Sequence, residues 1–470
     1  MSERTYTEIL ADFSLGLTPG VVPPDVLRQA ELSTLDFLGV ALAGSSSDAA
    51  RAVTAYVLAT GGAEQATVIG TRTRVPMALA GLANGTMGHS IELDDHEAHH
   101  RSKVHPGVVV MPAAWAASEL LDVSGAQFLT AVVLGYDIIG RLSAATPYPN
   151  YLGRERGLHT TPLFGPFAAG AVAAYLLGLT REQIVNMYGI IGSMASGLSE
   201  TVSAGSMVKS FHAGWAAHGG ILAAELARHG VTGPPAVLEG KRGFYRAFCG
   251  EGQYDLSVID AKLAEEFDIS LIMYKPYACA GGIHPALTAV DELRREHDIR
   301  AADVTDVLVL THRHAHETFA EPRAVKTRPA TGHQAQFSLP YAVAALLAEG
   351  AALTGQFTDA AVTNPETLRL AELVRVEVGA DLPQGDPGDE PARVVITLTD
   401  GRILSSTVPG GKGSLTVPMS ADELTGKFQR LAAPVIGAER AEQIEAVVST
   451  FRSAARAGRV IEMIRDGLGP

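Results

Sequence analysis

The sequence predicts a mainly helical protein with a large all-helical domain and a smaller α+β lid domain. The chain has 470 residues, more than the roughly 250 to 300 that a single hydrophobic core accommodates. Its first 270 residues show helical periodicity, and runs of β-branched residues appear only after that point. Because helical segments return near the end, we expect 1–270 and 410–470 to form the helical domain and 271–409 the lid domain.

The helical domain is expected to consist of helices separated by short Gly/Ser loops. In the segment 24–42, PDVLRQAELSTLDFLGVAL, apolar residues recur with helical spacing, and Pro23 and Pro24 lie where a first turn tolerates proline. The remaining expected helices are generally rich in alanine and span 47–60, 77–87, 108–121, 125–143, 167–177, 181–194 and 213–228.

The lid domain is expected to contain four strands. They are the β-branched segments 304–311, 373–378, 393–399 and 403–408. The turn signal Asp400-Gly401 separates the last two. Further helices are expected at 285–296, 341–347, 421–431 and 439–456, the last with Ile444, Val447, Val448 and Phe451 on one side.

Composition limits the classes of function. A formal charge of −14 argues against a nucleic-acid surface, which requires a basic face. The two cysteines, Cys249 and Cys279, have no CxxC spacing, so neither a disulfide framework nor a thiolate metal centre is expected, and a cytoplasmic protein is the default. The N-terminal residues lack a leader pattern, and the apolar stretch 167–179 is too short to span a bilayer, so we expect no membrane insertion.

A histidine-rich segment indicates where the chemistry lies. The segment 89–106, HSIELDDHEAHHRSKVHP, holds five of the fifteen histidines around the adjacent Asp94 and Asp95. Titratable groups are costly to bury without partners, and they cluster at functional sites. We therefore expect this segment to be the centre of an active site.

Several ordered motifs resemble one family. They are NGTMGHSIELDD, HPGVVVMPAAWAASE, GYDIIGR, GLHTTPLFGPFAAG, KSFHAGWAAHGG, GKRGFYRAF, KPYACAGGIHPALTA and FSLPYAVAALLAEG. Together they resemble the MmgE/PrpD family over nearly the whole chain. That family includes 2-methylcitrate dehydratases, cis-aconitate decarboxylases and iminodisuccinate epimerases. The resemblance implies a helical domain with an α+β lid, a homodimer, and chemistry on small di- or tricarboxylates without a metal or organic cofactor.

The resemblance also implies a set of site residues. They are Asp94, Asp95, His105, His159, Lys209, Lys275, His284 and Tyr341. Abstracting a proton next to a carboxylate requires a base and fixed groups that stabilise the developing charge. We expect Lys209 and Lys275 to hold substrate carboxylates, His105 or His159 to move the proton, and the aspartates to orient the histidines or keep them charged.

Each of these residues also has a purely structural interpretation. The two aspartates could cap a helix or lie in a solvated turn, and His105 and His159 could form hydrogen bonds within loops. Lys209 could lie at the surface. Lys275 leads into the small-residue run 279–282, where backbone can approach a ligand, and Tyr341 could simply belong to the core.

Metal binding is an alternative hypothesis. His96, His99, His100 and His105, with Asp94 or Asp95, could form a metal site, although their spacing matches no known ligand pattern. His312, His314 and His316 alternate at the end of an expected strand and could form a clip on one face. The glycine pairs 61–62 and 410–411 lack the context of a nucleotide-binding loop.

Two departures from the family pattern bear on the reaction. Cys279-Ala280 follows Lys275 where cis-aconitate decarboxylases carry an additional histidine, and His96 replaces the threonine of the usual Asp-Asp-Thr. The first departure disfavours decarboxylation, and the second indicates that the substrate contacts at His96 differ from those of the family. The leading hypothesis is therefore a dehydratase resembling 2-methylcitrate dehydratase, with an epimerase of the iminodisuccinate type as the alternative. A metal-dependent hydrolase and a non-catalytic carboxylate-binding protein are the hypotheses from other classes.

Overall fold

The computed structural model describes residues 4–97, 103–147, 150–201, 206–383 and 390–468. Its internal contacts divide the chain into two units. Unit 1 comprises Met1–Ser90, Asp94–Ile272 and Ser420–Pro470, and unit 2 comprises Ile91–Leu93 and Met273–Met419. The chain therefore belongs to unit 2 for three residues near the start of the histidine-rich segment and then returns to unit 1.

Unit 1 is built of helices with well-defined starts. Reciprocal capping boxes begin four of them, at Thr5, Ser124, Thr180 and Ser420. The helices are α1 (Tyr6–Gly16), α2 (Pro24–Gly44), α3 (Asp48–Thr60), α4 (Met77–Gly88), α5 (Gly107–Leu121), α6 (Gly125–Ala144), α7 (Tyr151–Arg156), α8 (Thr160–Leu177), α9 (Arg181–Ile191), α11 (Val208–Arg228), α12 (Phe244–Cys249), α19 (Ala421–Ile436), α20 (Ala438–Val448) and α21 (Arg459–Gly467).

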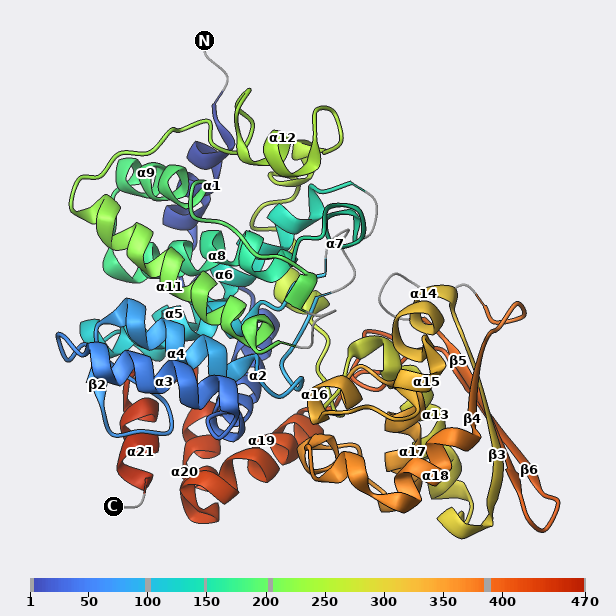
Figure 1. Cartoon of the computed structure of the whole chain (residues 1–470). Helices are drawn as coiled ribbons and strands as arrows, with labels where there is room; N and C mark the ends of the chain where they lie inside the picture. The colour runs from blue at the N-terminus through green and yellow to red at the C-terminus, as the bar shows by residue number, and fades with distance from the viewer. Residues whose placement is uncertain (1–3, 98–102, 148–149, 202–205, 384–389, 469–470) are drawn as a thin grey trace. The chain divides into compact units, whose positions relative to one another are not determined.

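The centre of unit 1 is a bundle in which α11 packs against α4, α5 and α8 (Figure 1). Glycines allow the helices to approach closely. A Cβ atom at Gly85 of α4 would lie 2.8 Å from Cα of Gly214 on α11, and one at Gly220 would lie 2.5 Å from the backbone nitrogen of Gly170 on α8. At such separations a side chain would clash with backbone, so glycine is required at both crossings.

The apolar helix α8 begins seven residues earlier than expected. Pro162 and Pro166 interrupt the helical pattern in the sequence, yet both lie inside the helix. The helix is long and apolar enough to cross a membrane, and 83% of it is buried. A core helix has the same properties, and α6, α5 and α11 surround it.

Unit 2 contains a four-stranded sheet in the order β4-β3-β5-β6. The strands are β3 (Val304–Thr311), β4 (Val374–Val378), β5 (Ala392–Leu398) and β6 (Ile403–Val408). β3 pairs in parallel with β4 and antiparallel with β5, and β6 pairs antiparallel with β5. The helices α13 (His284–Glu296), α17 (Leu339–Glu349) and α18 (Pro365–Leu373) lie on one side of the sheet (Figure 1), which explains why burial alternates along β5.

These features confirm the expected fold class, with three local corrections. Unit 1 is not entirely helical, because Ala66–Thr67 pairs antiparallel with Arg74–Val75. The helix expected at 439–456 ends at Val448, where Ser449 and Thr450 begin a turn and Phe451 starts a 3₁₀ segment. His312, His314 and His316 do not lie along one face of a strand, as the proposed metal clip required. β3 ends at Thr311, and a short helix begins at Arg313.

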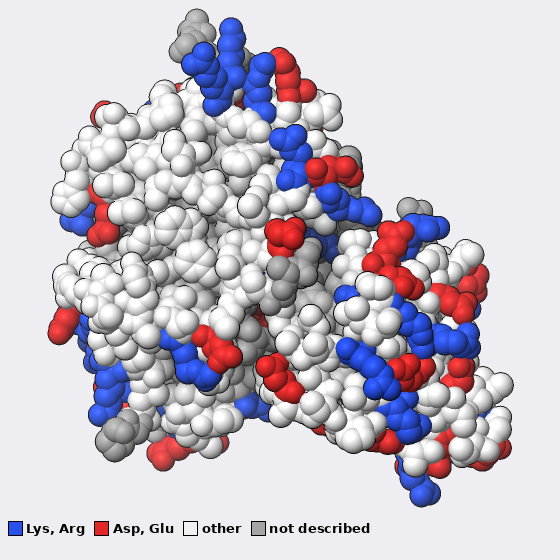
Figure 2. Space-filling view, in the orientation of Figure 1, with Lys and Arg blue, Asp and Glu red and all other residues white. Residues whose placement is uncertain are grey.

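Charged side chains are distributed without a basic stripe on the face that Figure 2 shows. Lys and Arg residues there alternate with Asp and Glu, and much of the surface of unit 1 in this view carries few charged residues of either sign. A continuous basic groove for a nucleic-acid backbone is therefore not present on this face.

Candidate active site

The candidate site begins where α4 ends. His89 is the C-terminal cap of α4. Glu92, three residues on, has a φ of 54°, a left-handed conformation that is costly for a residue with a side chain. The turn at this point precedes Asp94, whose side chain meets that of His89.

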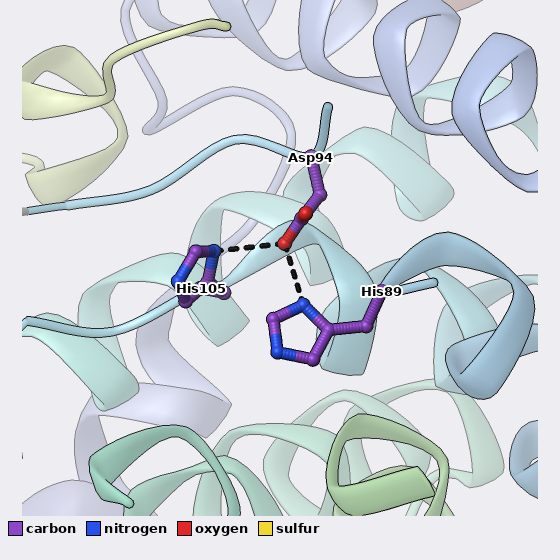
Figure 3. Close-up of side chains that lie close together, drawn as sticks. All are labelled: His89, Asp94 and His105. Carbon is purple, nitrogen blue, oxygen red and sulfur yellow. Dashed lines mark hydrogen bonds and ion pairs between the residues drawn. The ribbon is translucent and has the colours of Figure 1, made fainter. Parts of the chain in front are cut away.

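Asp94 connects two histidines. Its Oδ2 lies 2.8 Å from Nδ1 of His89 and 2.8 Å from Nδ1 of His105 (Figure 3). The Nδ1 of His105 also lies 3.0 Å from the carbonyl oxygen of Asp95. Because carboxylate and carbonyl oxygens only accept, both histidines must carry a proton on Nδ1. In the neutral rings, Nε2 then holds the lone pair.

Lys209 completes this chain of hydrogen bonds. Its ammonium lies 3.3 Å from Nε2 of His89, the nitrogen that holds the lone pair and can therefore accept. Lys209 is only 6% exposed and lies in the first turn of α11. The alternative of a surface lysine is therefore wrong.

Asp95 has a different role from Asp94. Its Oδ1 accepts a hydrogen bond from the backbone N–H of Gly107 at 3.0 Å, and its Oδ2 accepts one from the hydroxyl of Tyr136 at 2.5 Å. Burial raises the pKa of Asp95 to about 7, against the lowering effect of the Tyr136 hydrogen bond. Gly107 is the first residue of α5, so Asp95 caps this helix, as one of the structural interpretations proposed.

Three helices begin at the cluster. His105 lies just before α5, His159 is the N-terminal cap of α8, and Lys209 and His212 lie in the first two turns of α11. The backbone N–H of His105 donates to Thr161 of α8 at 3.1 Å. Helix N-termini carry partial positive charge, so this corner of unit 1 favours an anion.

The histidine rings pack against one another. The ring centres of His89 and His105 are 4.7 Å apart, those of His89 and His159 are 5.8 Å apart with the rings stacked, and those of His159 and His212 are 5.2 Å apart. The Nδ1 atoms of His159 and His212 are 3.0 Å apart. Four imidazole rings thus lie around one lysine in unit 1.

The surroundings keep three of these rings neutral. Burial, followed by the charge of Lys209, lowers the pKa of His89 to about 4 and that of His212 to about 4. Burial, followed by the charges of His89 and Lys209, holds the pKa of His159 well below its ordinary value. At pH 7 these three rings are neutral and each keeps a nitrogen lone pair, so the cluster combines potential proton acceptors with a fixed cation.

Among the residues that the structure describes, His89, Asp94 and His105 are grouped closely enough to hold a metal ion. Their 2.8 Å separations are typical of hydrogen bonds, and they are shorter than the roughly 3.4 Å between ligands of a tetrahedral site with bonds of about 2.0 to 2.1 Å. The nearby ammonium of Lys209 also opposes a cation. The geometry therefore fits a hydrogen-bonded cluster better than a metal centre.

Comparison with known proteins identifies the family. A model of the MmgE/PrpD N-terminal domain matches residues 8–257, and a model of the MmgE/PrpD C-terminal domain matches residues 277–452. The chain belongs to the MmgE/PrpD family. This confirms the resemblance found in the sequence, and the chain is therefore an enzyme of that family.

Several curated MmgE/PrpD relatives match over nearly their whole length. The cis-aconitate decarboxylase-like protein oryM of Aspergillus oryzae is 30% identical, covering 99% of this chain and 98% of that protein. The cis-aconitate decarboxylase of Aspergillus terreus is 27% identical, covering 94% of this chain and 92% of that protein. The enzyme of the same name from Mus musculus is 25% identical, covering 95% and 91%.

The site residues that the family resemblance implies for this chain fall into two groups. Asp94, Asp95, His105, His159 and Lys209 belong to unit 1, whereas Lys275, His284 and Tyr341 belong to unit 2. Within unit 2, Lys275 is 2% exposed and pairs with Glu92 at 3.1 Å, and Nε2 of His284 lies 3.2 Å from the carbonyl oxygen of Cys279.

The environment of Tyr341 agrees with its structural interpretation. Tyr341 is only 1% exposed, and its hydroxyl donates to the carbonyl of Gln356 at 2.9 Å. Burial raises its pKa to about 12. These contacts place it in the core of unit 2.

Two histidines of the cluster in unit 1 were not among the site residues predicted from the sequence. His89 and His212 both occur in the quoted motifs NGTMGHSIELDD and KSFHAGWAAHGG, but neither was among the predicted site residues. The spacing of Lys209 and His212, three residues apart at a helix start, could have indicated a shared face. Of the proposed metal ligands, His99 and His100 lie outside the described residues, and the ring of His96 is 6.0 Å from that of His105.

Proposed function

We propose that this enzyme is a cofactor-independent lyase that moves a proton at a carbon next to a carboxylate in a small tricarboxylate. The observation that carries the proposal is the cluster in unit 1, where neutral histidines surround the buried ammonium of Lys209 at the start of three helices. Such a site can bind a carboxylate, stabilise the charge that develops beside it, and exchange a proton with the adjacent carbon.

The names of the relatives make cis-aconitate the first substrate to test. Decarboxylation breaks the bond between the methylene carbon and its carboxylate, and the electron pair moves through the double bond to the carbon next to another carboxylate. Lys209 would stabilise this carbanion, and a histidine N–H would donate a proton to it. The products are carbon dioxide and an unsaturated dicarboxylate.

Dehydration of a 2-methylcitrate-like tricarboxylate was the leading hypothesis from the sequence and is the second candidate here. It is favoured by Cys279-Ala280, which stands where cis-aconitate decarboxylases carry a histidine. In that reaction a base takes the proton next to a carboxylate, and an acid protonates the departing hydroxyl. In its neutral form His105 suits the role of base, because Asp94 accepts the hydrogen bond from Nδ1 and the lone pair is then on Nε2.

The test is proton NMR in deuterated buffer with cis-aconitate, citrate and 2-methylcitrate. Decarboxylation is expected to release carbon dioxide, to create a terminal =CH2 group and to place deuterium on a carbon next to a carboxylate. Dehydration is expected to convert citrate or 2-methylcitrate into an unsaturated tricarboxylate without release of carbon dioxide. Lys209→Met is expected to reduce kcat/KM by about 10²-fold or more, because it removes the charge that stabilises the transition state. Lys241→Met, at an exposed lysine of the same unit, should leave kcat/KM unchanged.

The proposal fails if none of the three tricarboxylates is converted or exchanges protons with the solvent. It also fails at the level of the site if the Lys209→Met variant, folded as judged by circular dichroism, retains the wild-type kcat/KM.

A further inference from the structure

The contact between His159 and His212 is a hydrogen bond between two ring nitrogens. Their Nδ1 atoms are 3.0 Å apart. Such a bond contains a single proton, so one Nδ1 donates it and the other accepts it with a lone pair. In neutral rings, the donor has its lone pair on Nε2 and the acceptor has its proton on Nε2. The pair therefore always presents one basic and one acidic Nε2.

The surroundings favour the neutral form of both rings. His89, His105 and Lys209 are the titratable groups that face the pair. Burial is the largest cause that lowers the pKa of His159, followed by the repulsion that a protonated His89 and the ammonium of Lys209 would exert on an imidazolium there. His159 is also the N-terminal cap of α8, where the partial positive charge of the helix disfavours an imidazolium. His212 is 6% exposed, so its charged form is disfavoured by burial as well.

We propose that His212 is a positioning residue that fixes the tautomer of His159 and exchanges a proton with it, so that His159 alternates between a base and an acid at Nε2. This inference rests on the proposed function, in which a histidine of the cluster exchanges a proton with a substrate carbon, and it assigns that exchange to His159. It assigns a role to a buried histidine that sequence reasoning did not include among the site residues.

The two rings hold two protons before and after the transfer, and the proton taken from carbon is matched by one released to water. His159 begins with its proton on Nδ1 and takes a proton from the substrate carbon at Nε2, while the electron pair stays on the carbon. Its Nδ1 proton passes to Nδ1 of His212, which becomes an imidazolium and releases its Nε2 proton to water. The pair ends with His159 carrying a proton on Nε2, and in this form His159 can donate a proton to carbon.

Two substitutions at His212 test this role. His212→Phe removes the partner of His159, and His212→Asn places an amide near the position of Nδ1, which can form a hydrogen bond but cannot pass a proton on. In both variants kcat is expected to fall by about 10²-fold or more with KM changed by less than about threefold, because the loss affects proton transfer rather than binding. The pH dependence of kcat should change as well.

His218→Asn is the matched control. His218 lies on the same helix, its Nδ1 is 3.0 Å from the carbonyl of Ala78, and burial lowers its pKa too. It forms no ring contact with His159 in the described residues. A kcat within about twofold of the wild-type value is expected for this variant. Wild-type kcat and pH dependence in His212→Asn would overturn the proposal.

Nitrogen NMR of protein labelled with ¹⁵N-histidine provides a readout that does not depend on turnover. We expect one ring of the pair with its proton on Nδ1 and the other with its proton on Nε2, both neutral at pH 7, and a change of the His159 signals in His212→Phe. Two rings in the same tautomer would overturn the inference. If no tricarboxylate is converted, the proposed function fails, and the nitrogen spectrum still decides whether the tautomer pair exists.

Discussion

Asp94 determines the protonation of two histidines at once. Because one carboxylate oxygen accepts from Nδ1 of His89 and of His105, both rings direct the lone pair of Nε2 away from it. For His89 this lone pair meets Lys209. Since His89 is 1% exposed and lies beside an ammonium, the folded protein can protonate it only at a substantial cost in free energy.

This cost predicts a pH dependence of stability. In the unfolded chain His89 binds a proton near its ordinary pKa of 6.5, whereas in the folded protein it does so only near 4. Between these values the unfolded state binds the extra proton, so stability is lost as the pH falls. From pH 7.5 to pH 5 the wild type should lose about 2 kcal/mol more free energy of unfolding than His89→Asn.

Tryptophan fluorescence during urea unfolding can measure this difference, because both tryptophans, Trp115 and Trp215, lie in unit 1. His229→Asn, at an exposed histidine at the end of α11, should follow the wild-type pH dependence. Parallel curves for the wild type and His89→Asn would show that His89 does not titrate in this way.

The sequence predicted the residues of the site better than their roles. Asp94, His105, His159 and Lys209 were found through the motifs, and the structure places them in one cluster. Asp95 resembles Asp94 in sequence, and only the folded chain shows that its oxygens are occupied by Gly107 and Tyr136. The contact of His89 with Lys209 joins residues 120 positions apart, and no local pattern in a single sequence records such a contact.

Among the helices, the crossing of α4 and α11 positions the contact between His89 and Lys209. Gly85 lies one turn before His89, and Gly214 lies five residues after Lys209. A Cβ atom at Gly214 would lie 2.1 Å from the carbonyl oxygen of Leu82. Because backbone meets backbone here, any side chain would separate the two helices and move the lysine away from the histidine.

Gly214→Ala is therefore expected to destabilise unit 1 by about 1 to 3 kcal/mol and to reduce kcat/KM by increasing the separation of Lys209 and His89. Gly219→Ala on the same helix is the control, since a Cβ atom there would meet only the methyl group of Met194 at 3.7 Å. It should be neutral or stabilise the helix by up to about 1 kcal/mol. Equal effects of the two substitutions on fluorescence-monitored unfolding would contradict the close-packing argument.

The starts of α8 and α11, which lie beside the candidate site, were predicted too late in the sequence. The expected starts at residues 167 and 213 are late because the first turns of α8 and α11 contain prolines, histidine and lysine instead of a regular apolar pattern. In α11 the candidate site residues Lys209 and His212 replace residues that would signal a helix start, and in α8 Pro162 and Pro166 hide the start. The strands carry no such residues, and β3 and β6 were predicted with their observed bounds.

At the scale of the whole molecule, both ends of the chain form unit 1. Lys427 of α19 pairs with Asp36 of α2 at 2.7 Å, and their side chains are only 3% and 2% exposed. Burial raises the pKa of Asp36, whereas the charge of Lys427 lowers it. The C-terminal segment is thus part of the helical core that surrounds the site.

Breaking this pair is expected to be costly. Lys427→Leu leaves a buried carboxylate without its cation and should destabilise unit 1 by about 3 to 5 kcal/mol. The double variant Asp36→Leu/Lys427→Leu removes both charges and should recover most of this loss in urea unfolding followed by tryptophan fluorescence. If the double variant is no more stable than Lys427→Leu, the loss comes from packing of the lysine chain instead of the unpaired charge.

The pairing of α2 with α19 also has a consequence for synthesis of the protein. Asp36 and Lys427 are separated by 391 positions in the sequence, and a ribosome adds roughly 5 to 20 residues per second. The partner helix α19 is therefore synthesised about 20 to 80 seconds after α2, once unit 2 and most of the rest of unit 1 have been made. During that interval the nascent chain exposes a surface that a chaperone can bind, and a ribosome that stalls before Ser420 leaves it uncovered.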